Sequence, residues 1–281
     1  MKKLIKTLIR EIISLMFIIL GRFNLGQFIY EQFIDVIINR TKSVNHQGTK
    51  LVLSTPNRLT RYRADTFSSK EPETLDWLDG LPENSVLWDI GANVGLYTCY
   101  AAKKLNCRVF AFEPSVFNLE ILARNIHLNG LSDLVTIIPL SLSSELSINK
   151  LNMTSTSWGG AMSTFGESYG HDGKFLNKVF VLPVIGLSMS DASCLLGIPQ
   201  PDYIKMDVDG IEHLILKGGK SILDKAKGVI IEINDGFEIQ SEDARTYLRD
   251  AGFELKEKLH AAVYDSAESS ASDTYNQIWI K

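Results

Sequence analysis

Residues 89–95 read Asp-Ile-Gly-Ala-Asn-Val-Gly and lie between an apolar run at 86–90 and a helical pattern at 94–105. Gly91 permits a tight turn after the strand, and Gly95 lets the helix approach the strand closely. The loop also turns backbone N–H groups and a helix N-terminus toward a ligand. A strand, loop and helix of this kind predict the ligand-binding turn of a doubly wound α/β fold.

Short apolar runs alternate with helical segments through most of the chain. Strands that alternate with helices of this length indicate a largely parallel sheet covered on both faces. The predicted fold class is therefore α/β, with a doubly wound, mostly parallel sheet. We expect strands at 86–90, 108–112, 135–139, 203–208, 229–233, 253–259 and 277–280, and helices at 94–105, 115–129, 211–223 and 243–251.

The length of 281 residues suits one large domain with an extension. We place a helical and variable extension at residues 1–70, with a helix at 28–38 and a strand at 50–54, and the ligand-binding domain at 71–281. Residues 140–200 interrupt the alternation and are rich in Ser, Thr and Gly. An insertion of this length is typical of a lid or binding loop, and a surface excursion is the alternative.

Composition and charge exclude several classes of function. The net charge of −4 gives no reason to expect a nucleic-acid partner. The three cysteines, Cys99, Cys107 and Cys194, have no metal-like spacing, and no HExxH or CxxC motif is present. These features argue against a zinc site and favour a reducing, cytoplasmic location.

Residues 1–20 form a segment of distinct character, with an unbroken apolar run at 15–20. Helical spacing of the polar residues predicts an amphipathic helix with a basic face. The apolar run is too short to span a bilayer, and no small-residue cleavage site follows it. Its apolar face could dock on the inner face of an anionic membrane, or pack on the domain or on a second subunit. The oligomeric state stays open. The basic residues are Lys2, Lys3, Lys6 and Arg10.

The loop and the next strand point to the nature of the ligand. Asn93 stands where a dinucleotide fingerprint has its second Gly, which disfavours a nicotinamide cofactor and an oxidoreductase. S-adenosylmethionine (SAM) has no pyrophosphate, and Asp89 is compatible with its positively charged methionine end. Glu113 ends the strand at 108–112 and lies 22 residues after Gly91 (113 − 91). A carboxylate at this spacing can accept hydrogen bonds from ribose hydroxyls.

A second polar cluster, at 205–213, follows the strand at 203–208. Asp207 lies at the carboxyl end of that strand, where open α/β sheets bind ligands. We therefore expect Asp207 to be the catalytic base or to position the acceptor, with His213 as the second candidate. Asp209 and Glu212 could equally favour the start of the next helix.

Glu232 and Asn234 end the following strand. Together with Asp207 they could supply oxygen ligands to Mg²⁺, although nothing in the spacing demands a metal.

The motifs taken together resemble the FkbM family of SAM-dependent methyltransferases. The resemblance implies a class I methyltransferase fold with a mostly parallel seven-stranded sheet, SAM as methyl donor, and transfer to oxygen, commonly a hydroxyl of a sugar or natural product. It assigns Asp89, Gly91, Asn93 and Gly95 to the donor loop, Glu113 to the ribose, and Asp207 to the active site. Similar members often carry Glu where Asp209 stands. The segments that carry the resemblance are 89–98, 112–114, 125–130, 158–160 and 205–212.

The acceptor is not specified by these motifs, because the donor site does not report it. We expect a small-molecule or glycan acceptor such as a sugar, glycan or glycolipid. N-methylation of an amine or amide is one alternative. A non-catalytic binding protein with a degenerate methyltransferase fold is another, although the intact donor loop and Glu113 argue against it.

Overall fold

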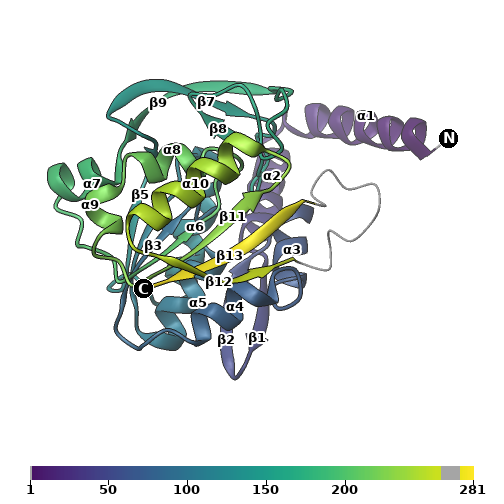
Figure 1. Cartoon of the computed structure of the whole chain (residues 1–281). Helices are drawn as coiled ribbons and strands as arrows, with labels where there is room; N and C mark the ends of the chain where they lie inside the picture. Colours follow the sequence, from purple (N-terminus) through teal and green to yellow (C-terminus); the bar gives the residue numbers. More distant parts are fainter. Residues whose placement is uncertain (1, 261–272) are drawn as a thin grey trace.

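The computed structural model describes residues 2–260 and 273–281, and its centre is a seven-stranded sheet (Figure 1). The strand order is β12-β13-β11-β10-β3-β4-β5, and β13 alone in this sheet pairs antiparallel with both neighbours. The expected mostly parallel, seven-stranded sheet is therefore confirmed. The strands are β3 (Val86–Ile90), β4 (Arg108–Phe112), β5 (Val135–Ile138), β10 (Tyr203–Met206), β11 (Gly228–Asn234), β12 (Glu254–Leu259) and β13 (Thr274–Ile280).

Helices cover both faces of the sheet and bury one apolar cluster on each. On one face lie α4 (Pro72–Asp79), α5 (Leu96–Leu105) and α6 (Val116–Asn129). The other face packs against α7 (Met189–Leu196), α8 (Glu212–Lys217), α9 (Lys220–Leu223) and α10 (Glu238–Asp250). Because successive strand side chains point to opposite faces, Trp88 and Ile90 pack in one cluster and Leu87 in the other.

Three predicted helices of the ligand-binding domain differ from the structure in their bounds by two residues or more. The first begins at Leu96 instead of residue 94, because the loop continues through Gly95 in a left-handed conformation. The predicted helix at 211–223 is two helices that break at Gly218 and Gly219. A Cβ at Gly219 would lie 1.8 Å from the Met189 side chain, so the break lets α7 pack closely. The helix predicted at 243–251 begins earlier, at Glu238.

The Ser-, Thr- and Gly-rich segment at 140–200 forms a second sheet and not an irregular excursion. Its four strands run in the order β6-β9-β7-β8, and α7 follows them. Figure 1 shows this sheet above one end of the central sheet. The strands are β6 (Ser141–Leu142), β7 (Ser147–Met153), β8 (Ser163–Phe165) and β9 (Phe180–Leu187).

The N-terminal 70 residues divide into two parts. The helices α1 (Lys2–Leu20) and α2 (Asn24–Ile38) come first, and α1 projects from the body (Figure 1). The remaining elements are continuous with the domain, because Leu51, Leu53, Ala64 and Phe67 are buried in its core. In the described part of the chain, no helix has both the length and the apolar composition to cross a membrane. These elements are β1 (Thr41–His46), β2 (Thr49–Ser54) and α3 (Arg58–Asp65).

Candidate active site

The strand order reverses at β3, and this reversal creates the crevice of the site. From β3 the chain continues to β4 and β5 on one side, and it later returns to β10 and β11 on the other. Connections that leave a parallel sheet in opposite directions open a crevice at the carboxyl ends of the two central strands. The loop after β3 and the loop after β10 therefore meet at this point.

Two glycines let the loop after β3 fit against its neighbours. Gly91 has φ +82°, and a Cβ there would lie 1.8 Å from the carbonyl oxygen of Asp207. Gly95 has φ +78°, and a Cβ there would lie 2.3 Å from the side chain of Leu122. Both positions therefore require glycine, for the backbone conformation and for the close approach.

Asn93 and Glu113 join the loop to the end of β4. The main-chain N–H of Asn93 donates to one carboxylate oxygen of Glu113 at 2.8 Å, and the N–H of Ser115 donates to the other at 2.8 Å. Glu113 is buried, and burial raises the pKa of its carboxyl to about 7 although these hydrogen bonds lower it. The side-chain oxygen of Asn93 is buried and has no hydrogen-bond partner among the described residues. It is therefore able to accept from a ligand.

A buried lysine links the ends of β3 and β10. Lys205 and Asp89 are paired in the register of the two strands, and Lys205 Nζ lies 3.3 Å from Asp89 and 3.7 Å from Asp207. Burial alone would lower the pKa of Lys205, but the charges of Asp89, Asp207 and Glu71 outweigh it and raise the pKa. Asp89 also accepts from the Thr98 hydroxyl. The carboxylate of Asp89 therefore contacts Lys205 and Thr98. Asp89 does not line either of the two cavities described below.

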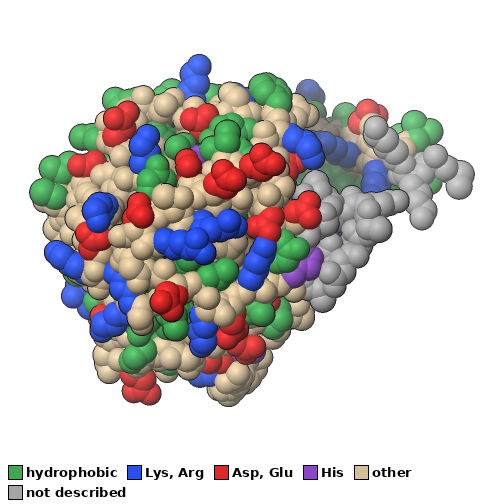
Figure 2. Space-filling model, viewed as in Figure 1, with side chains coloured by type: hydrophobic (Ala, Val, Ile, Leu, Met, Phe, Trp, Pro, Cys, Tyr) green, Lys and Arg blue, Asp and Glu red, His purple; other side chains and the backbone are tan. Residues whose placement is uncertain are grey.

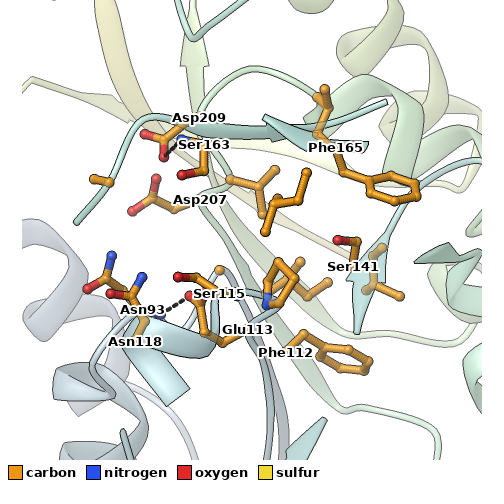
Figure 3. Close-up of a pocket in the computed structure, with 18 of the residues that line it drawn as sticks. Asn93, Phe112, Glu113, Ser115, Asn118, Ser141, Ser163, Phe165, Asp207 and Asp209 are labelled. Atoms are coloured by element: carbon orange, nitrogen blue, oxygen red, sulfur yellow. Dashed lines mark hydrogen bonds between the residues drawn. The ribbon is translucent and has the colours of Figure 1, made fainter. Parts of the chain in front are cut away.

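The first cavity lies between the ends of β3, β4 and β10. Figure 3 shows Asp207 and Asp209 across it from Glu113 and Asn118, with Phe112 and Phe165 toward its other end. A pocket with one polar and one apolar end suits a ligand that carries both a polar chain and an aromatic base. We call it the donor cavity.

Part of the insertion closes over the donor cavity. The side chains of Asn93 and Asn118 donate to the carbonyl oxygen of Gly160 at 2.8 and 3.0 Å. Asp209 accepts from the main-chain N–H groups of Met162 and Ser163 at 2.6 and 3.3 Å. The segment from Gly160 to Ser163, which belongs to the insertion at 140–200, is thus held by hydrogen bonds at both edges of the cavity.

Trp158 and Glu212 have partners within the chain. The indole of Trp158 donates to Glu120 at 3.0 Å. Glu212 is buried and accepts from the main-chain N–H groups of Val208 and Gly210 at 3.0 and 3.1 Å. Glu212 therefore shapes the loop after β10, and it does not line either cavity.

A second cavity adjoins the first. The two cavities share Gly91, Asn93 and Asp207. The second, which we call the acceptor cavity, is also lined by charged and polar side chains, none of which was predicted as a site residue. These are Arg63, Lys70, Glu71, Tyr97 and Lys205.

Glu71 and Tyr97 are hydrogen-bonded inside the acceptor cavity. The Tyr97 hydroxyl donates to Glu71 at 2.9 Å, and Lys70 forms an ion pair with Glu71. Burial and the Glu71 charge raise the pKa of Tyr97 well above its ordinary value. Arg63 uses its Nε to bond the carbonyl oxygen of Gly159 at 2.8 Å. Arg63, Lys70 and Glu71 lie in no sequence motif, because they come from the segment before β3. Tyr97 lies within the motif at 89–98, but that motif does not indicate its contact with Glu71.

His213 lies outside both cavities. Its side chain is buried, and its ring packs edge-on against Phe237 with centroids 5.9 Å apart. Burial lowers the pKa of the His213 ring. The expected second candidate for the base therefore has no geometric support, because it does not reach the space where a donor and an acceptor would meet.

Asn234, one of the predicted magnesium ligands, has its side chain engaged in hydrogen bonds within the chain. Asn234 uses its side-chain oxygen to accept from Gly236 at 2.9 Å and its amide to donate to Thr274 at 3.2 Å. Burial and the charge of Asp207 raise the pKa of Glu232 well above its ordinary value, which disfavours its charged form. Within the described ranges, no group of three or more His, Cys, Asp or Glu side chains is placed to hold a metal ion. The residues do not fit a magnesium site.

Comparison with known proteins decides the family. Residues 89–255 match the model of the methyltransferase FkbM domain. This range holds the loop after β3, the carboxylate after β4 and the loop after β10. The chain belongs to the FkbM methyltransferase family. It is thus a SAM-dependent methyltransferase of the Rossmann-like, class I fold, and the alternative of a nicotinamide oxidoreductase is wrong.

Two curated relatives extend over comparable parts of this FkbM methyltransferase. The hexuronic acid methyltransferase AglP of Haloferax volcanii is 28% identical over 176 residues, which cover 62% of this chain and 65% of that protein. The methyltransferase sdnD of Sordaria araneosa is 27% identical over 198 residues, covering 62% of this chain and 76% of that protein. Among solved structures, a precorrin-6y C5,15-methyltransferase of Geobacter metallireducens is 16% identical, with a TM-score of 0.43 over 75% of this chain and 88% of that chain.

Proposed function

We propose that this enzyme transfers the methyl group of SAM to an oxygen atom of a sugar or glycan acceptor. One observation carries the proposal: the donor and acceptor cavities meet at Gly91, Asn93 and Asp207. A ligand in each cavity would therefore have its reacting end at the same place. Holding two reactants together in this way removes several kcal/mol of the entropic barrier.

The donor cavity has the groups that SAM requires. Glu113 would accept hydrogen bonds from the ribose hydroxyls. The main chain of Asn93 contacts Glu113, and the side-chain oxygen of Asn93, which is buried without a partner among the described residues, would accept a hydrogen bond from the donor. Phe112 and Phe165 would contact the adenine. When bound, SAM supplies a methyl group that its sulfonium makes electrophilic. Asp89 orients the loop through Lys205 and Thr98, and we assign it no direct contact with the donor.

The acceptor cavity contains charges of both signs. Arg63, Lys70 and Lys205 could bind the carboxylate or hydroxyl oxygens of a sugar acid, and Glu71 and Asp207 could accept from its hydroxyls. The hexuronic acid methyltransferase among the relatives supports an acidic sugar as acceptor. A cavity with fixed cations and carboxylates also selects against an apolar acceptor, since the charges would lose their hydration without a partner.

Asp207 is the residue that can act on the acceptor oxygen. It lines both cavities, and Lys205 lies 3.7 Å from its carboxylate. Asp207 would hold an acceptor hydroxyl and take its proton as the new oxygen–carbon bond forms and the carbon–sulfur bond breaks. A positioned base of this kind accounts for about 10²–10⁴-fold in rate. The proton then leaves to solvent, because Asp207 is half-exposed.

An acceptor panel with isotope-labelled SAM tests the proposal. We would offer a glucuronic acid glycoside, a glucose glycoside of the same aglycone, and an amino sugar glycoside, and detect products by mass spectrometry. The expected product is the glucuronic acid glycoside with one labelled methyl group in place of a hydrogen, and fragmentation should place that methyl on oxygen. Labelling of nitrogen in the amino sugar alone would show an N-methyltransferase. If no sugar is labelled while S-adenosylhomocysteine (SAH) still binds, the acceptor class is wrong.

A further inference from the structure

The two N-terminal helices expose an extensive apolar surface. Large hydrophobic side chains of α1 are exposed at position after position, for example Leu4 (77%) and Ile12 (58%). The same is true of α2, where Phe28, Phe33 and Ile34 are exposed. A contiguous apolar surface of this extent on a soluble domain marks an interaction site. The exposed side chains of α1 are Leu4, Ile5, Leu8, Ile9, Ile12, Ile13, Leu15, Met16, Ile18 and Ile19.

The joint between the helices holds α1 as an arm directed away from the body. Gly26 is buried in α2, and a Cβ there would lie 1.8 Å from the carbonyl oxygen of Leu20. The rings of Phe17 and Tyr30 pack across the joint with centroids 4.6 Å apart. Figure 1 shows the result, with α1 extending beyond the rest of the molecule. The apolar surface of α1 therefore cannot reach the domain core without breaking this packing.

We propose that α1 lies in the plane of an anionic lipid surface and docks the enzyme there. The sequence of α1 has four basic residues, Lys2, Lys3, Lys6 and Arg10, against the single acid Glu11. Figure 2 shows Lys or Arg side chains beside hydrophobic ones on this arm. A helix with apolar surface and basic side chains binds at the headgroup level of membranes that carry negative charge.

Charge and pattern favour lipid over a second copy of this chain. Two parallel α1 helices would bring their basic ends together, with only Glu11 of each to offset the repulsion. Residues 15–20 are apolar on every side of the helix. A second helix in a coiled coil would cover only a narrow stripe of these apolar side chains and leave the others in water. A lipid surface contacts an apolar helix end from several sides and supplies the opposite charge.

The docking would place the active site near the membrane. In Figure 1, α1 projects at the same end of the molecule as the second sheet, which closes over the donor cavity. An acceptor sugar attached to a lipid would then be within reach of the acceptor cavity. This last step rests on the proposed function, whereas the docking itself does not.

Vesicle flotation of the full chain tests the docking. We expect the protein to float with phosphatidylcholine vesicles that contain phosphatidylglycerol, and to bind pure phosphatidylcholine vesicles more weakly. Ile12→Glu should weaken binding to the anionic vesicles by roughly tenfold or more, because an Ile that would lie among the lipid chains is replaced by a charge. Lys6→Gln with Arg10→Gln should weaken it by on the order of tenfold and leave binding to the neutral vesicles unchanged.

Leu195→Glu is the matched control. Leu195 is 59% exposed on α7, close to the 58% of Ile12, and lines neither cavity. This variant should float as wild type does. The proposal is overturned if wild type prefers neutral vesicles or binds neither kind, or if Ile12→Glu and Leu195→Glu behave alike. Light scattering that shows a dimer, lost in Ile12→Glu and unaffected by vesicles, would identify a second copy as the occupant. SAH binding in solution, measured by calorimetry, reports separately on the proposed function.

Discussion

The main-chain N–H of Asn93 lies 2.8 Å from the carboxylate of Glu113 and donates a hydrogen bond to it. This bond joins the loop after β3 to the end of β4. The two halves of the donor cavity therefore depend on each other. The carboxylate that we propose for the ribose therefore also holds the loop that would surround the rest of the donor.

Replacing Glu113 with Gln should weaken donor binding by about 10- to 100-fold. The amide has no charge, and one end of it would place N–H groups against the main-chain donor of Asn93 or Ser115. Calorimetric titration with SAH measures the effect. Glu145→Gln, an exposed change away from the cavity, should bind as wild type does. Unchanged affinity in Glu113→Gln would remove this residue from the donor site.

Donor affinity should increase as the pH rises from about 6 to 8. Burial raises the pKa of Glu113 to about 7, so the free enzyme carries the neutral acid below that pH and the carboxylate above it. The neutral form contributes stability that is present below about pH 4.5 and lost as the pH rises through 7. Ribose hydroxyls favour the carboxylate, so SAH should bind about three- to tenfold more tightly at pH 8 than at pH 6. In Glu113→Gln the pH profile should be flat over this range.

Asp207→Asn should reduce methyl transfer by about 10²–10⁴-fold and change SAH affinity far less. The amide is close in shape to the carboxylate but cannot take a proton. Single-turnover kinetics with labelled SAM separate the chemical step from binding. Asp224→Asn, on the exposed end of α9, is the control for loss of one carboxylate. Wild-type turnover in Asp207→Asn would require another base.

Lys205→Met should destabilise the fold by roughly 3–5 kcal/mol. The change leaves Asp89 buried without its ion pair and removes the cation beside Asp207. Urea denaturation measures the free energy of unfolding. Lys220→Met removes an exposed ion pair with Asp224 and should cost less than about 1 kcal/mol. Equal losses in the two variants would contradict a buried ion pair at Lys205.

Gly91→Ala and Gly130→Ala separate backbone strain from close packing. Both glycines have positive φ, but a Cβ at Gly130 meets nothing within 4 Å. Gly130→Ala should therefore cost about 1–2 kcal/mol from backbone conformation alone. At Gly91 the Cβ would also meet the Asp207 carbonyl, so the loss should exceed roughly 3 kcal/mol and SAH binding should fall. Thermal unfolding of the two variants, measured with and without SAH, compares their stability and their binding of SAH.

The local parts of the fold could be predicted from the sequence. The strand at 86–90, the loop that follows it and the carboxylate at Glu113 depend on residues close together in the chain. Their periodicity and spacing reflect backbone geometry, which short stretches determine by themselves. The strand-to-helix alternation also indicated the parallel sheet, because such connections have few topological solutions.

Contacts between distant residues could not be predicted in this way. The sequence marked Asp89 and His213 as site residues. Only the tertiary structure shows Asp89 directed at Lys205 and Thr98, and His213 packed on Phe237 outside both cavities. Where a side chain points on a buried element depends on which neighbours pack against it, and the chain pattern does not contain that information.

The sequence by itself indicated the family, the glycine loop after β3 and the candidate base Asp207, because these features lie in short motifs at the ends of strands. Tertiary structure alone decided the acceptor cavity, which combines Arg63 and Glu71 with Lys205 from the other half of the chain. It also decided that residues 140–200 form a sheet over the site. The physical reason is that such groups are brought together only when distant segments bury apolar surface against each other, and that burial is a property of the whole fold.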